Sequence, residues 1–61
     1  MKAVITIQMD NAAFEDSNGD ELFLILRSLE DSIWGCQLKK GDTHTLRDSN
    51  GNTVGQMVIK K

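Results

Sequence analysis

One segment near the middle of this chain has the apolar periodicity of a helix, and it constrains what the remaining residues can form. Between Gly19 and Trp34 the apolar side chains recur at three- and four-residue spacing, which gives a single stripe on one side of a helix. The stripe consists of Leu22, Ile25, Leu26, Leu29 and Ile33. Asp20 and Glu21 put negative charge in the first turn, and Gly35 follows as a left-handed cap residue. We therefore predict one amphipathic helix whose stripe faces a sheet.

The residues before this segment alternate with a period of two, which predicts a strand from Ala3 to Met9. One side of the strand carries Ala3, Ile5, Ile7 and Met9, and the other carries Val4, Thr6 and Gln8. Asp10 and Asn11 favour a turn at its end. Phe14 then stands alone among polar residues, where it either starts a short helical turn or fills the edge of the core. We favour the second.

A hairpin is predicted after the helix, with strands over Thr43–Asp48 and Thr53–Lys60. Asn50 and Gly51 between these runs favour a two-residue type I′ turn. That turn places Leu46 opposite Gly55 and makes Leu46, Met57 and Ile59 a core face. The opposite face then carries Thr45, Arg47, Val54, Gln56 and Val58, together with Val4, Thr6 and Gln8 from the first strand. This open face is a second, weaker candidate for docking a partner.

These elements predict a small α+β fold of topology β-α-β-β, with one amphipathic helix on one face of a three-stranded, mainly antiparallel sheet. A right-handed crossover allows the third strand to lie between the first and the second, and its apolar residues suit the centre, but the strand order stays open. Sixty-one residues make a single small domain, residues 1–61, with one core. Because a core of this size supplies only a few kcal/mol of stability, a homodimer stays open as an alternative.

Several chemistries find no support in the residues. The two Asp-Ser-Asn-Gly segments place Asp16 and Asp48 first in calcium-loop spacing, but the sixth and twelfth positions lack the required glycine and glutamate. Cys36 and His44 are the only residues of their kinds, which argues against zinc and against a cysteine–histidine nucleophile. We expect no enzyme, no catalytic residue, no metal and no cofactor.

The location of the protein is also predicted from what the chain lacks. Its longest apolar run, Leu22 to Leu26, is far shorter than the roughly 20 residues that span a bilayer. A single cysteine and the absence of a signal-peptide pattern indicate the cytoplasm.

Charge is divided along the sequence, although the formal net charge is only −2. Residues 1–34 are mainly acidic, and residues 35–61 are mainly basic. The second half contains Lys39, Lys40, Arg47, Lys60 and Lys61. A small nucleic-acid-binding protein that uses this basic C-terminal hairpin is therefore the alternative function, but the strands offer no aromatic residues for base stacking.

The leading hypothesis concerns aromatic residues that lie off the helical stripe. Phe23 and Trp34 share a row with Arg27 and Glu30, away from the predicted core. Such residues either extend a small core over the sheet edge or remain exposed as an interface. We predict a non-enzymatic protein-binding surface made of Phe23, Arg27, Glu30 and Trp34.

Several stretches of the chain together resemble small uncharacterised proteins of phages and prophages. These stretches are Ile5-Thr6-Ile7, the segment Asp10-Asn11-Ala12-Ala13-Phe14-Glu15-Asp16, then Glu21-Leu22 with Ile25-Leu26-Arg27, and finally the segment from Leu46 to Gly55. The resemblance covers most of the chain and describes a fold more than an activity. It implies a bacterial or phage cytoplasmic setting, in which small proteins inhibit or adapt host factors, and it carries over no functional residues.

Overall fold

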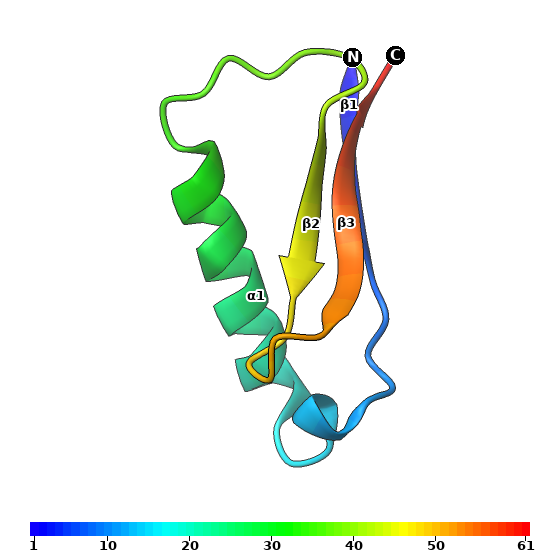
Figure 1. The fold of residues 1–61 in the computed structure, drawn as a ribbon, viewed down its shortest axis with the longest axis vertical. Coiled ribbons are helices and arrows are strands. Elements are labelled where there is room, and N and C mark those ends of the chain that lie inside the picture. Colours follow the sequence, from blue (N-terminus) through cyan, green and yellow to red (C-terminus); the bar gives the residue numbers. More distant parts are fainter.

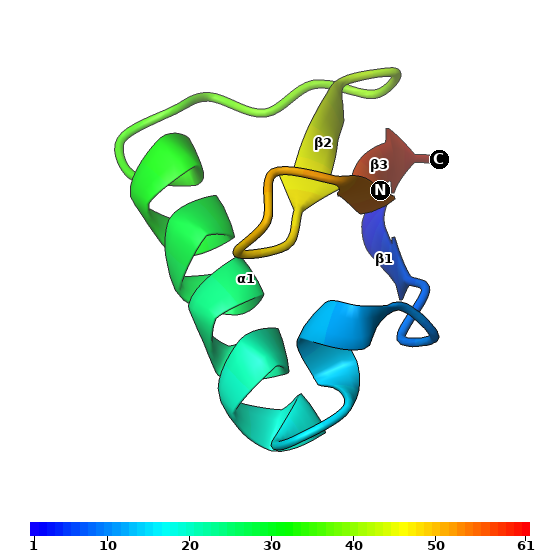
Figure 2. The same cartoon turned by 60° about the horizontal axis from the view of Figure 1, so that its bottom comes forward.

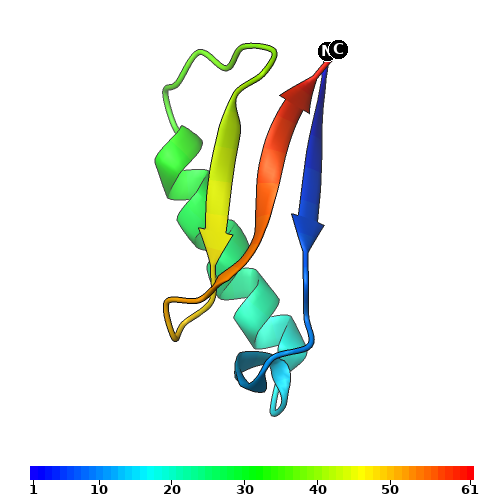
Figure 3. The same ribbon diagram turned by 45° about the vertical axis from the view of Figure 1, so that its right-hand side comes forward.

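The chain forms a strand, a single 3-10 turn, a long helix and a hairpin, and the computed structural model describes all 61 residues. The elements are β1 (Lys2–Ile7), the 3-10 helix η1 (Ala12–Phe14), α1 (Asn18–Ile33), β2 (Thr43–Arg47) and β3 (Thr53–Lys60). One helix packs on one side of a three-stranded sheet (Figure 1). The molecule is elongated, with extents of 35 × 20 × 17 Å, and both termini lie at the same end (Figure 3).

The sheet has the strand order β1-β3-β2, and both neighbouring pairs are antiparallel. The structure thus settles the strand order, which the sequence had left open, with the third strand in the middle. Leu46 pairs with Gly55 and His44 with Met57, as the turn spacing predicted. Leu46, Met57 and Ile59 are all buried, so the predicted core face is correct.

The turn that joins β2 to β3 differs from the predicted type I′ turn. Asn50 does not have a positive φ angle, and only Gly51 adopts the left-handed region, with φ of 84°. The Gly51 N–H donates to the Asp48 carbonyl at 3.0 Å, and the Asp48 N–H donates to the Asn52 carbonyl at 2.9 Å. A type I turn from Asp48 to Gly51 fits this pattern, because aspartate is favoured at its first position and glycine at its last. The pairing shifts by one residue between Leu46 and Arg47 to accommodate it.

The strict alternation predicted for β3 is broken at Gly55. Val54 was expected on the open face, but it is 5% exposed and belongs to the core cluster together with Met57, three residues further on. Gly55 lies so close to β1 that an added Cβ atom would be 1.8 Å from the Thr6 carbonyl oxygen. This close approach admits only glycine. On the other side of β3 the register shift between Leu46 and Arg47 passes over Val54, and a bulge of this kind redirects a side chain, so that Val54 reaches the core.

The helix begins at Asn18 and ends at Ile33, within one residue of the prediction, and Gly35 follows with φ of 76°. Its buried side is centred on Glu21, Ile25 and Leu29. Leu26 was predicted to be part of the buried stripe, but it is 40% exposed, so this prediction is wrong. The apolar stripe is wider than the surface that α1 has available to pack against, and Leu26 lies on its uncovered flank.

Phe14 fills the end of the core, as we favoured, and the short helical turn at this position begins at Ala12 and ends at Phe14 instead of starting there. It is the buried residue of η1 and is 5% exposed. Asn11 caps η1 by accepting a hydrogen bond from the Ala13 N–H at 3.1 Å. The turn packs against the first part of α1.

The helix covers the sheet unevenly. It packs against β2 and η1, and β1 lies at the far side of the sheet (Figure 2). The core consists of seven buried apolar residues: Phe14, Ile25, Leu29, Leu46, Val54, Met57 and Ile59. None of them comes from β1. The outer face of the helix and the β1 side of the sheet therefore remain open.

Candidate functional site

The residues predicted to bind a partner lie together on the outer face of α1. Phe23, Arg27, Glu30 and Trp34 follow one another at helical spacing, on the side opposite the buried residues Glu21, Ile25 and Leu29. Phe23 is 59% exposed and Trp34 is 87% exposed, and the two charged residues between them are also exposed. Of the two alternatives, core or surface, the aromatic side chains take the surface.

The two aromatic residues mark the two ends of this outer face. Trp34 lies eleven positions after Phe23, which corresponds to about 16 Å along a helix axis. The Trp34 N–H still donates to the Glu30 carbonyl at 3.1 Å, but its ψ angle of 124° takes the chain out of the helix. Trp34 thus lies at the end of α1, and no neighbouring part of the chain buries its side chain.

Leu26 extends the apolar part of this surface. It lies three residues after Phe23 and four before Glu30, so its side chain adjoins the same face. Leu26 is 40% exposed, so its side chain leaves apolar area in contact with water. This area adds to the apolar surface at the outer face of α1. The spacing of apolar residues alone could not show that Leu26 is exposed, because Leu26 also fits the spacing of the buried stripe.

A second open apolar surface lies on β1. Ile5 pairs with Met57, and their side chains point to the same side of the sheet. Met57 is 2% exposed whereas Ile5 is 46% exposed, because the helix stops short of β1. Near the chain termini, a shallow hollow of about 190 Å³ is lined by Met1, Lys2, Ala3, Leu38 and Ile59.

Four polar side chains, here called the polar clasp, join three separate segments at the other end of the molecule. They are Asn11, Glu21, Asp48 and Ser49. The Glu21 carboxylate accepts hydrogen bonds from the Ser49 N–H at 2.7 Å and from the Ser49 hydroxyl at 2.9 Å. The Asn11 side-chain amide donates to Asp48 Oδ2 at 2.7 Å. The clasp fastens the hairpin turn to the start of α1 and to η1.

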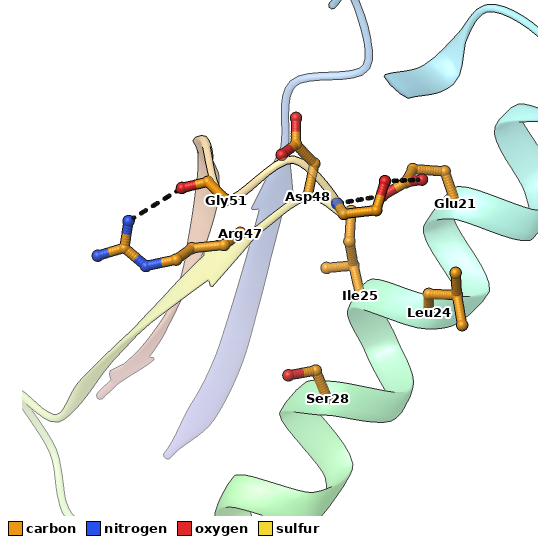
Figure 4. Close-up of a pocket in the computed structure, with 8 residues that line it drawn as sticks. Glu21, Leu24, Ile25, Ser28, Arg47, Asp48 and Gly51 are labelled. Carbon is orange, nitrogen blue, oxygen red and sulfur yellow. Dashed lines mark hydrogen bonds between the residues drawn. The ribbon is translucent and has the colours of Figure 1, made fainter. Parts of the chain in front are cut away.

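The polar clasp borders the larger hollow of the molecule, which has a volume of about 410 Å³ (Figure 4). Glu21 reaches from α1 to the hairpin turn, and Ser28 and Leu24 continue the helix side of the wall. Arg47 points away from Glu21, and its guanidinium donates to the Gly51 carbonyl and to the Thr53 hydroxyl. The carboxylates are already engaged by donors of the chain, which suits a structural role better than acid–base chemistry.

Asp48 is the one residue whose titration is clearly perturbed. Burial by itself would raise the pKa of Asp48, but hydrogen bonds from the backbone of Asn52, the side chain of Asn11 and the backbone of Asn50 outweigh it. The pKa of the Asp48 carboxyl therefore lies below its ordinary value. The Asn50 and Asn52 N–H groups both donate to Oδ1 at 2.9 Å. The spacing that suggested a calcium loop is thus used to hold a turn.

The remaining reactive side chains are apart from one another. Cys36 is a free, exposed cysteine whose Sγ contacts the Ser32 carbonyl at 3.5 Å. His44 is half-buried on β2, on the helix side of the sheet beside Met57. No group of three histidine, cysteine, aspartate or glutamate residues is arranged to hold a metal ion.

Charge is divided along the long axis of the molecule. Lys2 pairs with Lys60, and the loop with Lys39 and Lys40 meets the end of β3, where the Gly41 N–H donates to the Ile59 carbonyl. These lysines and Lys61 belong to segments that meet at the end that carries both termini (Figure 1). The segment of residues 10–20 lies at the opposite end, and its acidic residues Asp10, Glu15, Asp16 and Asp20 are exposed. Arg47 lies at the acidic end, so the hairpin does not present one continuous basic surface.

No family model, no curated protein and no solved structure matches this chain. The helix α1 is too short and too polar to cross a membrane.

Proposed function

We propose that this protein is a non-enzymatic binding module that docks on another protein through the outer face of α1. Phe23 and Trp34 act as apolar anchors, and Arg27 and Glu30 between them supply polar contacts. The observation that carries the proposal is the exposure of both aromatic side chains on one helix face. Tryptophan and arginine are enriched among the residues that dominate binding energy at protein interfaces.

The kind of partner follows from the sequence resemblance to small phage and prophage proteins. We extend the proposal to a protein of the bacterial host or of the phage, met in the cytoplasm and inhibited or adapted by this module. The single helix face offers a ridge, which fits a partner with an apolar groove.

The test compares what the wild-type chain and two variants retain from a bacterial lysate. The double variant Phe23→Ala, Trp34→Ala removes the anchors, and Leu24→Ala is the matched control because Leu24 is 53% exposed on another side of the same helix. Loss of two anchor residues costs at least about 2 kcal/mol of binding, or roughly 30-fold in affinity. The wild type and the control should retain the same protein, and the double variant should lose it.

Circular dichroism separates binding from folding in this experiment. All three truncated side chains are exposed, so each variant should keep the helical spectrum of the wild type. Unfolding of the double variant would mean that the aromatic residues support the core. Equal retention by the double variant, or equal loss in the control, would contradict the proposal.

Nucleic-acid binding remains the second candidate, because five lysines gather at the end that carries the termini. Their exposed ammonium groups would contact phosphates and release counterions, which makes the affinity strongly salt-dependent. A titration of DNA and RNA at increasing salt tests it. Measurable binding that weakens steeply with salt and disappears in Lys39→Ala, Lys40→Ala would favour this function over the protein-binding one.

A further inference from the structure

The outer edge of β1 is an unprotected sheet edge. Figure 3 shows no segment beside β1 on the side away from β3. Edge strands usually carry charged residues, proline or bulges that prevent pairing with another chain. The chain contains no proline, and β1 carries a charge only at its first residue, Lys2, while residues 3–9 contain none. The other edge strand, β2, is shorter, ends in Arg47 and has an irregular register there.

The backbone groups at this edge belong to the odd-numbered residues. The Gln8 N–H donates to the Val54 carbonyl at 2.7 Å, which places Gln8 among the residues that bond to β3. In an antiparallel pair this role alternates, so Val4 and Thr6 bond to β3 as well. Ala3, Ile5 and Ile7 therefore direct their N–H and C=O groups to the free edge.

The side chains of the same residues form an apolar row. Met1, Ala3, Ile5, Ile7 and Met9 are the odd-numbered residues, and every one of them is apolar. Met1 is 79% exposed, Ile5 is 46% exposed and Met9 is 38% exposed. The order of these residues is similar in both directions from Ile5, with an apolar residue on each side and a methionine at each end. In an antiparallel pair of two such rows, every apolar residue therefore lies opposite another apolar residue.

We propose that a second copy of this chain pairs with the β1 edge, antiparallel and centred on Ile5. Two three-stranded sheets then join into one sheet of six strands. Ile5 lies opposite Ile5 of the partner subunit, and Ala3 lies opposite Ile7 of the partner subunit. The two-fold axis passes between the isoleucines, so every contact occurs twice.

The surface of the isolated chain is large enough for such an interface. A folded monomer of this mass exposes about 3,950 Å² on the usual scaling of surface with mass. This chain exposes 4502 Å². The excess is about 550 Å² per copy and about 1,100 Å² for two copies, which is just above the lower limit of roughly 1,000 Å² for a specific interface.

The charge distribution favours the antiparallel arrangement. The basic end with Lys2, Lys39, Lys40, Lys60 and Lys61 and the acidic end with Asp10, Glu15, Asp16 and Asp20 lie at opposite ends of β1. Antiparallel pairing brings the basic end of one copy beside the acidic end of the other. Lys2 then lies beside Gln8 of the partner subunit and close to Asp10 of the partner subunit. Parallel pairing would put like charges together.

This dimer goes beyond the binding function proposed above, because it uses a different surface. Phe23 and Trp34 lie on the outer face of α1, and α1 packs on the β2 side of the sheet (Figure 2). Each dimer therefore presents two outer helix faces to partner proteins, which raises the avidity for a target that also has two sites.

Cysteine trapping tests the geometry. Directly opposite residues in a hydrogen-bonded antiparallel pair have Cα atoms about 5.5 Å apart, within the range of a disulfide. The variant Ile5→Cys, Cys36→Ser should form a covalent dimer under mild oxidation. The control Thr45→Cys, Cys36→Ser places an exposed cysteine on the other edge strand and should stay largely uncrosslinked. Crosslinking through Thr45→Cys alone would overturn the assignment to β1.

Sedimentation equilibrium tests the association itself. The wild type should reach twice the monomer mass of 6.8 kDa as its concentration rises. Ile5→Lys puts two like charges face to face and should weaken the dimer at least ~10-fold. Ala3→Pro is a second variant, since it removes an edge N–H that β3 does not use. Both variants should keep the circular dichroism of the wild type.

The double variant Phe23→Ala, Trp34→Ala separates the two proposals. It should dimerise like the wild type even though it no longer retains a partner. A dimer that dissociates in this variant but not in Ile5→Lys would place the interface on α1 and refute pairing at β1. A wild type that remains monomeric at all concentrations would refute the dimer, and the partner-binding proposal would be judged separately by its own experiment.

Discussion

Replacement of Gly55 by alanine should be among the most damaging small changes in this protein. An added Cβ atom would lie 1.8 Å from the Thr6 oxygen, 2.8 Å from the Thr6 carbonyl carbon and 3.0 Å from the Ile7 Cα atom. Ordinary contact begins near 3.4 Å, so β1 must move away by more than an ångström. Backbone atoms surround the site, and no side chain can rotate to make room.

The cost follows from what that movement breaks. Overpacking of a well-packed site costs about 1–3 kcal/mol, and each lost backbone hydrogen bond adds about 1 kcal/mol. The bond from the Gln8 N–H to the Val54 carbonyl is the first at risk, because it adjoins Gly55. We expect Gly55→Ala to lower the free energy of unfolding by about 3 kcal/mol, which is most of the stability available to a domain of this size.

Urea denaturation followed by circular dichroism measures this effect. Gly19→Ala is the matched control, since nothing lies within 4 Å of a Cβ atom at Gly19 in the first turn of α1. That variant should be as stable as the wild type or more stable by up to about 1 kcal/mol, because alanine favours the helix. If Gly55→Ala is as stable as Gly19→Ala, the close approach of β1 and β3 at this position is wrong.

Three further predictions concern the polar clasp and the helix. Glu21→Gln should lower the free energy of unfolding by about 1–2 kcal/mol, because the bonds from Ser49 lose their charged acceptor; urea titration checks this, and an unchanged midpoint would contradict it. The pKa of Asp48 is lower in the folded chain than in the unfolded chain, so its stabilising effect is present above about pH 4 and is lost as the pH falls through the folded pKa. Thermal melts between neutral and acidic pH should therefore show a smaller acid-induced loss for Asp48→Asn than for the wild type, and equal losses would refute the assignment. Finally, Ile25→Ala should lower the free energy of unfolding by about 2–4 kcal/mol, and Leu26→Ala should lower it by less than about 1 kcal/mol, because only Ile25 is buried. Urea titration of both variants checks this, and a larger loss for Leu26→Ala would contradict the orientation of the helix.

The sequence left the strand order open but was sufficient to predict the element order and the pairing of Leu46 with Gly55. These features depend on apolar periodicity and on short-range turn chemistry, both of which are local. The same pattern could not reveal the exposure of Leu26 or Ile5. Whether an apolar residue is covered depends on how far the opposing layer extends, and one helix is too narrow for three strands.

The contacts of the polar clasp could not be predicted from the sequence either. Asn11, Glu21, Asp48 and Ser49 each have a local explanation as turn or helix-start residues, and these explanations conceal their contacts across 28 and 37 positions of the chain.

Prediction of the proposed binding surface was limited in another way. The spacing of Phe23, Arg27, Glu30 and Trp34 correctly placed them on one helix face, but it left their exposure undecided. Only the three-dimensional arrangement shows that no second layer covers that face.

Amide hydrogen exchange along β1, followed by NMR at low and high protein concentration, probes the open side of the sheet most directly. Val4 and Thr6 should be protected at both concentrations, because their N–H groups bond to β3. Ala3, Ile5 and Ile7 should exchange rapidly in dilute solution and become protected as the concentration rises. Protection of Ile5 at every dilution would show that the chain itself covers this edge, and rapid exchange of Ile5 at every concentration would show that no second copy pairs with it.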